Sequence, residues 1–193
     1  MPLSTKLDKR NEDIKIYING EFFHRDQAKI SVFDSGFLLG DGIWEGIRLV
    51  NNSWLFLDEH LDRLYEGCKA IDIKLDEDKK FLTNAIIETQ KINDITDAAH
   101  ARVMVTRGNK IKPFQQPSLS KDGINLVIIM EHSEEHPNTD GVKLVTVPQV
   151  RGLPMSQDPK LNSHSKLNCI IACIQANKSG CLLYTSPSPR DSS

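Results

Sequence analysis

The chain has 193 residues, of which 39% are hydrophobic and 26% are charged, and its formal net charge at pH 7 is −2. This mix is typical of a globular protein that is large enough to bury a core. A charge this close to zero gives no electrostatic reason to expect nucleic acid or an anionic membrane as a partner. No apolar run approaches the roughly 20 residues that span a bilayer, and residues 1–13 lack the apolar core of a signal peptide. We therefore expect a cytoplasmic protein.

The histidines and cysteines give no sign of a metal site. Neither the six histidines nor the four cysteines follow the spacing of known ligand sets. Cys169 and Cys173 share one face of an expected helix, where we expect them as small buried residues in a reducing compartment.

Short strands are expected near the N-terminus. Residues 14–18 alternate in polarity, Asn19-Gly20 is a hairpin turn signal, and residues 21–23 return as the second strand. The apolar run 30–32 predicts a third strand, which a loop over residues 33–36 follows.

The next segment combines strands, glycines and helix starts. Residues 47–50 and 54–57 predict two strands around a turn, and Asp58 and Asp76 are expected to cap two helices. Four glycines precede these strands: Gly36, Gly40, Gly42 and Gly46. The first helix has an apolar stripe that consists of Leu61, Leu64, Tyr65, Cys68 and Ile71.

The second half of the chain is expected to contain the end of one domain, a linker and the beginning of a second domain. Residues 101–106 and 124–130 predict strands, and the polar, proline-containing residues 131–140 predict a linker. Residues 142–147 predict a strand, and a helix should run from Ser163 or Ser165 to about Lys178. One strand and one helix cannot bury a core alone, which predicts that a larger domain only begins here.

The segment from Ile30 to Arg63 resembles the N-terminal signature of the class IV, or fold-type IV, aminotransferases, which use pyridoxal 5'-phosphate (PLP). The resemblance is carried by Gly40-Asp-Gly-Ile-Trp-Glu-Gly-Ile-Arg48 and by His60-Leu-Asp-Arg63, and it extends over nearly all of residues 14–180. This family includes branched-chain and D-amino-acid aminotransferases and aminodeoxychorismate lyase.

The resemblance implies an α+β fold in several parts. A small N-terminal α/β domain would occupy residues 1–130, a linker residues 131–140, and the start of a larger, β-rich PLP-binding pseudobarrel domain residues 141–180. Residues 181–193 (CLLYTSPSPRDSS) look like translated sequencing-adapter DNA. We therefore expect a truncated domain and a non-native tail, and no turnover of substrate by this chain alone.

In the resembled family a lysine just before a helix binds PLP covalently, and an asparagine and an apolar run follow it closely. Lys166, in the segment from Asn162 to Asn168, is the leading candidate on this basis. An alignment anchored on the downstream Ala176 instead puts Asn162 at that place and leaves Lys160 as the rival lysine. Without the family, Lys166 reads as a solvated residue of a first helical turn.

Arg63 matches the family arginine that contacts the cofactor phosphate. A guanidinium can bind phosphate through two parallel hydrogen bonds. Helical spacing places Arg63 off the apolar stripe, and spacing alone favours a pair with Glu59 or Glu66. Arg48 is expected to form an ion pair with Glu45 or with the helix that follows.

Four further residues match substrate-contacting positions of the family. Trp44 takes the place of a pocket aromatic, although core packing would also explain it. His100 and Arg102 share one face of a strand and match positions that branched-chain enzymes use for substrate contact. Lys112 follows a Thr-Arg-Gly motif and stands where one member of the D-amino-acid enzymes' carboxylate trap is expected.

The implied reaction moves an amino group between an α-amino acid of the branched-chain or D-amino-acid type and a 2-oxo acid. Lys166 would transfer the α-proton as general base and acid, in a homodimer whose second subunit completes the site. A PLP lyase of the aminodeoxychorismate type would share Lys166 and Arg63. A non-catalytic fragment that serves as a dimerisation module is the other alternative.

Overall fold

A computed structural model describes residues 8–133, 141 and 143–185. The chain divides into two compact units: Asp8–Glu135 with Asn162–His164, and His136–Leu161 with Ser165–Ser193 and Met1–Leu7. We call these the N-terminal unit and the C-terminal unit. Parts of the expected first domain, linker, strand and tail (residues 1–7, 134–140, 142 and 186–193) lie outside the described residues.

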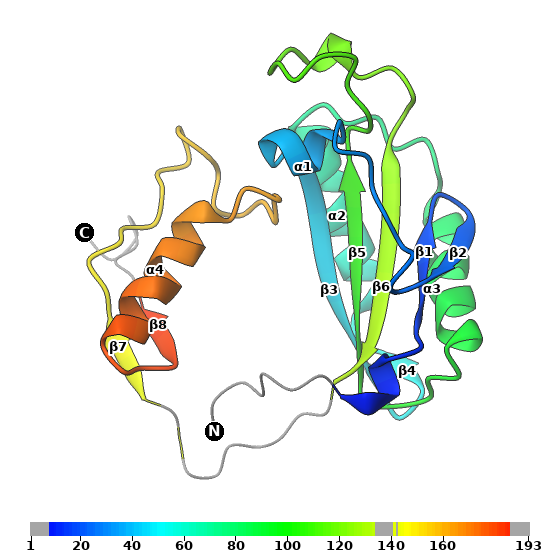
Figure 1. Cartoon of the computed structure of the whole chain (residues 1–193), viewed down its shortest axis with the longest axis horizontal. Coiled ribbons are helices and arrows are strands. Elements are labelled where there is room, and N and C mark those ends of the chain that lie inside the picture. Colours follow the sequence, from blue (N-terminus) through cyan, green and yellow to red (C-terminus); the bar gives the residue numbers. More distant parts are fainter. Residues whose placement is uncertain (1–7, 134–140, 142, 186–193) are drawn as a thin grey trace. The chain divides into compact units, whose positions relative to one another are not determined.

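The N-terminal unit is built on an antiparallel sheet of six strands in the order β2-β1-β6-β5-β3-β4 (Figure 1). The long central strands β3, β5 and β6 pair over most of their length. In chain order the strands are β1 (Lys15–Ile18), β2 (Glu21–His24), β3 (Gly42–Val50), β4 (Ser53–Trp54), β5 (Ala99–Thr106) and β6 (Asn125–His132).

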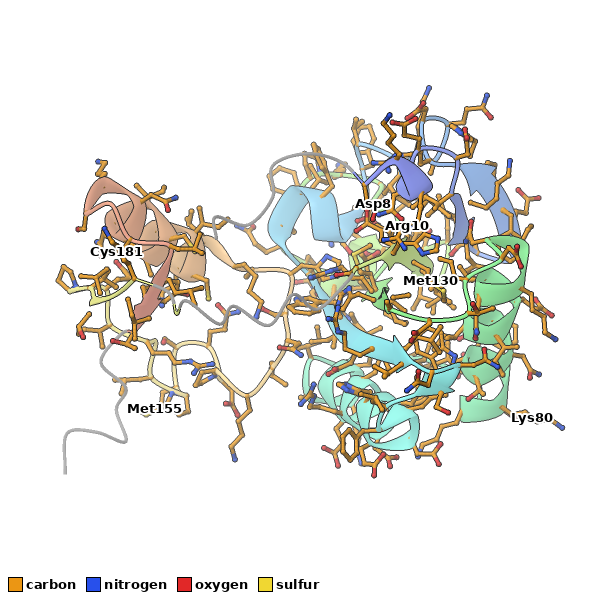
Figure 2. All side chains as sticks on the ribbon, turned by 90° about the horizontal axis from the view of Figure 1, so that it is seen from below. Asp8, Arg10, Lys80, Met130, Met155 and Cys181 are labelled. Atoms are coloured by element: carbon orange, nitrogen blue, oxygen red, sulfur yellow. The ribbon has the colours of Figure 1, made fainter. Side chains whose placement is uncertain are left out.

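Two helices, α2 (Leu57–Ala70) and α3 (Lys79–Ile92), cover one face of this sheet (Figure 1). The core lies between the sheet and these helices, because the residues of β3 and β5 that face the helices are apolar except for Glu45. Met130 of β6 is fully buried in this layer, whereas Lys80 lies on the outer side of α3 (Figure 2). Three short helices lie at the ends of the sheet: η1 (Lys9–Asn11), α1 (Ser35–Leu39) and η2 (Pro117–Leu119).

The expected hairpin forms, whereas the expected third strand does not. Asn19 and Gly20 adopt positive φ angles of 51° and 97° between β1 and β2, as a tight hairpin turn requires. Residues 30–32 pair with no described strand, and Val32 is 66% exposed. This apolar run is therefore a loop rather than a strand.

The glycine-rich segment is more regular than the sequence predicts. Asp34 caps the unexpected helix α1 by accepting a hydrogen bond from the backbone N–H of Phe37 at 3.0 Å. β3 then begins at Gly42 and passes through Gly46, so it is nine residues long. The cap of α3 is Asp78 rather than Asp76, and it accepts from the backbone N–H of Phe81 at 2.7 Å.

The C-terminal unit contains β7 (Leu144–Thr146), α4 (Leu167–Lys178) and β8 (Leu183–Thr185). β7 and β8 pair in parallel, and their small core consists of Val147, Ala172 and Ala176. β8 lies within the range expected as a tail. Cys169 and Cys173 are exposed, so the expectation that they are buried is wrong. No helix in the described parts of the chain is long and apolar enough to cross a membrane.

Candidate functional site

A cavity of about 590 Å³ lies on the sheet face opposite α2 and α3, and only the N-terminal unit lines it. The strand alternation creates it: on β5, Ala101 and Val103 face the helices, while His100, Arg102, Met104 and Thr106 face the cavity. One part of the wall is an apolar cluster of Ile14, Ile16 and Val127. The cavity therefore combines an apolar surface with cationic and polar groups, as small-molecule sites commonly do.

The expected substrate residues Trp44, His100 and Arg102 meet on this face. The guanidinium carbon of Arg102 lies 4.0 Å from the centroid of the Trp44 ring, which is a cation–π contact. Burial lowers the pKa of His100, and the nearby charges of Arg102 and Arg48 lower it further. His100 is therefore a neutral imidazole beside a cation at pH 7.

A buried carboxylate, that of Asp34, lies in the wall of the cavity. Asp34 is 2% exposed, and its oxygens accept hydrogen bonds from Thr106 Oγ1 at 2.5 Å, Asn125 Nδ2 at 2.7 Å and the Phe37 N–H at 3.0 Å. Three donors satisfy a carboxylate without a cation. Asp34 thereby joins the start of α1 to β5 and β6.

Arg63 is held on the helix face of the sheet. Its Nε and Nη2 donate to the two carboxylate oxygens of Glu45, both at 2.6 Å, and His60 Nδ1 lies 2.8 Å from Glu45 Oε2. Glu45 is fully buried, whereas the Arg63 side chain is 53% exposed. The partner expected from helical spacing, Glu59 or Glu66, is thus replaced by a strand residue that is distant in sequence.

The expectation that Arg48 pairs with Glu45 or with the following helix is wrong. Strand residues alternate between faces, so Arg48 lies on the side opposite Glu45 and α2. Arg48 Nη1 instead donates to the carbonyl oxygen and the hydroxyl of Ser133, both at 3.1 Å.

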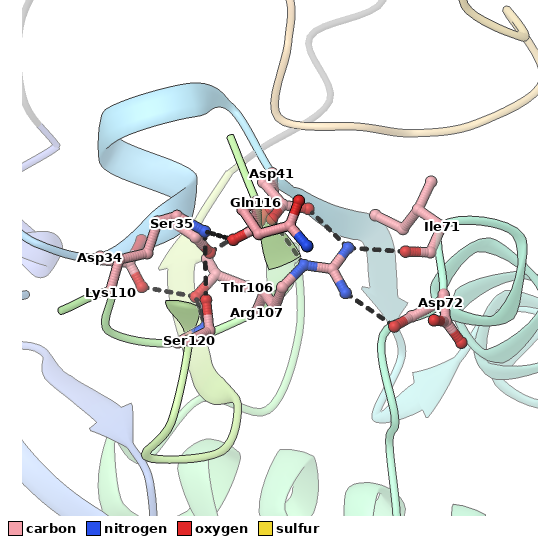
Figure 3. Close-up of polar contacts among 11 residues, drawn as sticks. Asp34, Ser35, Asp41, Ile71, Asp72, Thr106, Arg107, Lys110, Gln116 and Ser120 are labelled. Carbon is pink, nitrogen blue, oxygen red and sulfur yellow. Dashed lines mark hydrogen bonds and ion pairs between the residues drawn. The ribbon is translucent and has the colours of Figure 1, made fainter. Parts of the chain in front are cut away.

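Arg107 joins three segments of the chain through its hydrogen bonds (Figure 3). It donates to both carboxylate oxygens of Asp41 at 2.7 and 3.0 Å, and to the carbonyls of Ile71 and Asp72 at 2.6 and 2.7 Å. These carbonyls lie at the end of α2, where a helix lacks backbone donors of its own. The arginine of the Thr-Arg-Gly motif therefore stabilises the fold. Lys112 lies in the exposed loop that follows and does not line the cavity.

The segment Asn162–His164 extends the sheet along the edge of β3. The backbone N–H of Trp44 donates to the Asn162 carbonyl at 2.8 Å, and that of His164 donates to the Gly42 carbonyl at 2.9 Å. The side-chain amide of Asn162 reaches Glu45 Oε1 at 3.3 Å. Both candidate lysines belong to the C-terminal unit, where the carbonyl of Lys166 accepts the Ile170 N–H at 2.9 Å at the start of α4.

Comparison with known proteins decides the family. The family model described as amino-transferase class IV matches residues 42–186, which include both β3 and α4. The chain belongs to the class IV aminotransferases.

Individual class IV relatives agree with this assignment. A putative branched-chain-amino-acid aminotransferase of Methanocaldococcus jannaschii is 37% identical over 86% of this chain, which covers 57% of that protein. A D-alanine aminotransferase of Staphylococcus haemolyticus is 28% identical over 72% of this chain and 49% of its own length. The chain thus spans about half the length of these curated relatives.

A solved structure confirms the expected fold. The crystal structure of the branched-chain aminotransferase from the archaeon Thermoproteus uzoniensis, with norvaline, matches with a TM-score of 0.81. At 20% identity the match covers 92% of this chain and 61% of that one. The fold is therefore the fold-type IV fold that the Ile30–Arg63 segment predicts.

Several polar residues of the candidate site and of the Arg63 cluster are not predicted as such from the sequence. Glu45 had a visible signal, because it stands among the helix-facing residues Ile43, Ile47 and Leu49 of β3, where a carboxylate needs a cation. The contacts of Asp34 with Thr106 and Asn125, and that of His60 with Glu45, join residues that are distant in the sequence, so no local pattern predicts them.

The stability of the N-terminal unit is expected to fall in acid in two steps. Burial lowers the pKa of His100 and of His164 below 6.5, so both rings are neutral above that pH and cost no stability there. As the pH falls below 6.5, the unfolded chain binds protons more readily than the folded one, and the free energy of unfolding decreases. Burial raises the pKa of Glu45, but the hydrogen bonds from Arg63 and His60 outweigh it, and the net pKa lies below 4.5. Its contribution is therefore lost only below that pH.

Urea unfolding at several pH values checks this dependence. Both tryptophans, Trp44 and Trp54, belong to the N-terminal unit, so their fluorescence reports that unit. In the H100Q/H164Q variant, the decrease in unfolding free energy below pH 6.5 should disappear, and the decrease below pH 4.5 that Glu45 causes should remain. An unfolding free energy that stays constant from pH 7 to pH 5 would contradict this.

Proposed function

We propose that the protein is a PLP-dependent aminotransferase that moves an amino group between an apolar α-amino acid and a 2-oxo acid. The observation that supports this most directly is Arg63, which a fully buried carboxylate holds in one orientation within a chain of the class IV family. The branched-chain type is our first choice of substrate, because the cavity wall that Ile14, Ile16 and Val127 form suits an apolar side chain.

Arg63 would bind the phosphate of PLP. Its contacts with Glu45 occupy Nε and Nη2, so Nη1 and the second Nη2 proton can form a parallel pair with phosphate oxygens. Half of the Arg63 side chain is accessible, and Glu45 raises the Arg63 pKa, so the charge is permanent. These residues fit the phosphate end of the cofactor.

Lys166 would carry PLP covalently and move the α-proton of the substrate. PLP, when bound, withdraws electrons from the substrate Cα and makes that proton labile. An amine near a helix start is disfavoured as a cation by the helix dipole, which suits a lysine that must work unprotonated. Lys160 is the second candidate.

Arg102 would hold the substrate carboxylate. Its guanidinium lies in the cavity wall, and the Trp44 ring fixes its plane. His100 would contact the same substrate, and Lys112 would approach it only after movement of its loop. We also propose that the protein acts as a cytoplasmic homodimer, which light scattering of the purified protein would test.

The proposed reaction can be tested in a single half-reaction of a protein that carries this chain together with the remainder of the class IV domain, because no turnover is expected of this chain alone. PLP should bind the protein at one equivalent and give a visible absorbance band. Adding leucine should convert PLP into pyridoxamine 5'-phosphate, detected by mass spectrometry, whereas D-alanine should convert it more slowly. Conversion only by D-alanine would reassign the substrate to the D-amino-acid type. Pyruvate release from aminodeoxychorismate without pyridoxamine 5'-phosphate would indicate the lyase, and failure to bind PLP would indicate a non-catalytic module.

A further inference from the structure

His164 has a set position in the wall of the cavity. Three contacts fix its backbone on the edge of β3: the His164 N–H to the Gly42 carbonyl at 2.9 Å, the Ser163–Ile43 bridge, and Trp44 Nε1 to the Ser163 carbonyl at 3.2 Å. The imidazole therefore does not depend on a mobile loop for its place in the cavity.

Two glycines provide the space that the imidazole occupies. A Cβ at Gly36 would lie 3.1 Å from His164 Nδ1, and a Cβ at Gly42 would lie 3.1 Å from Cδ2 and 3.2 Å from Nε2. All three distances are tighter than ordinary contacts, although a Cβ at Gly36 would first meet Thr106 Cγ2 at 2.5 Å and one at Gly42 the Val105 carbonyl oxygen at 2.6 Å. Gly36 and Gly42 therefore leave room for the His164 ring, because a larger residue at either position would contact it.

The Nε2 atom of His164 is buried and has no hydrogen-bond partner among the described residues. A buried polar atom without a partner costs about 1–3 kcal/mol, so native proteins retain few of them. Burial lowers the His164 pKa and outweighs the opposing effect of the Ile43 backbone, so the ring is neutral, and its tautomer decides whether Nε2 donates or accepts.

The neighbouring polar groups do not satisfy this nitrogen. Asp34, the nearest carboxylate in the cavity wall, is already occupied by Thr106, Asn125 and the Phe37 N–H. Arg102 is close enough for its charge to lower the His164 pKa, and both residues line the same cavity. A ligand with an anionic head and an adjacent hydrogen-bonding oxygen would satisfy both groups.

We propose that His164 is a substrate-contacting residue whose Nε2 hydrogen-bonds the head of a 2-oxo acid in this cavity. Arg102 then holds the carboxylate, and the apolar tail lies on the cluster of Ile14, Ile16 and Val127. This assignment rests on the proposed function and adds to it a residue outside the expected site.

The test uses 4-methyl-2-oxopentanoate alone, without cofactor, on protein with carbon-13-labelled histidine. The acid should shift the His164 imidazole signal in nuclear magnetic resonance spectra, with the signal assigned by its loss in H164Q. His164→Leu should weaken binding about tenfold, the loss expected for one hydrogen bond. His164→Gln, which keeps a hydrogen-bonding group, should stay within about threefold of the wild type, as should the control His24→Gln, whose side chain does not line the cavity.

Each outcome decides the assignment. Unaltered affinity in H164L, or an unmoved His164 signal when the acid binds, would overturn it while pyridoxamine formation still supports the aminotransferase. If the acid does not bind at all, the His164 assignment falls, and the half-reaction judges the proposed function separately. Should H164L fail to fold, the affinity of H164Q and the movement of the wild-type His164 signal on addition of the acid provide the decision.

Discussion

Replacing Arg107 with alanine is expected to lower the free energy of unfolding of the N-terminal unit by about 3 kcal/mol. The arginine is 14% exposed and makes four hydrogen bonds, two of them to the Asp41 carboxylate. Its removal leaves a largely buried carboxylate without a cation and the end of α2 without donors. Urea unfolding followed by tryptophan fluorescence measures the loss.

Two variants control this prediction. Arg107→Lys keeps the charge but cannot reproduce the planar fork, so about half of the loss should remain. Arg10→Ala removes an exposed ion pair with Asp8 and should cost less than about 1 kcal/mol. A loss below about 1 kcal/mol in R107A would show that the three segments are held together by packing alone.

Replacing Arg63 with methionine is expected to destabilise the N-terminal unit by about 2 kcal/mol. Breaking a fully buried ion pair typically costs about 3–5 kcal/mol, but solvent reaches the outer half of Arg63 and reduces the effect. Glu45 keeps only His60 and the more distant Asn162 amide, so its pKa should rise. The same variant should lose affinity for PLP and for inorganic phosphate.

A double-mutant cycle separates the pair from its surroundings. Glu45→Met removes the buried charge as well, so the E45M/R63M protein should recover part of the stability that R63M loses. It should not recover phosphate binding, because the guanidinium is absent. Recovered phosphate binding in the double variant would place the phosphate site elsewhere.

Elements with local signals were predictable from the sequence, and elements that depend on distant partners were not. The β1–β2 hairpin follows from Asn19-Gly20, because positive φ angles are encoded by those residues themselves. Residues 30–32 carry the same apolar signal as a strand, yet a strand needs a free edge to pair with. α1 was missed because its signal is short and interrupted by glycine.

The candidate site shows the same division. Helical spacing places Arg63 outside the core but cannot reveal Glu45, which is 18 residues earlier and on a strand. The alternation of β5 predicts correctly that His100 and Arg102 share a face. His164 requires the packing of Gly36 and Gly42 around it, which no spacing rule describes.

The most direct test of this account is the identity of the lysine that carries PLP. The protein is incubated with PLP, reduced with borohydride, digested, and analysed by mass spectrometry for phosphopyridoxyl-lysine. The account predicts the label on Lys166, its loss in Lys166→Arg and its retention in Lys160→Arg. A label on Lys160, or one that persists in K166R, would contradict the assignment of Lys166 and with it the proposed chemistry of the site.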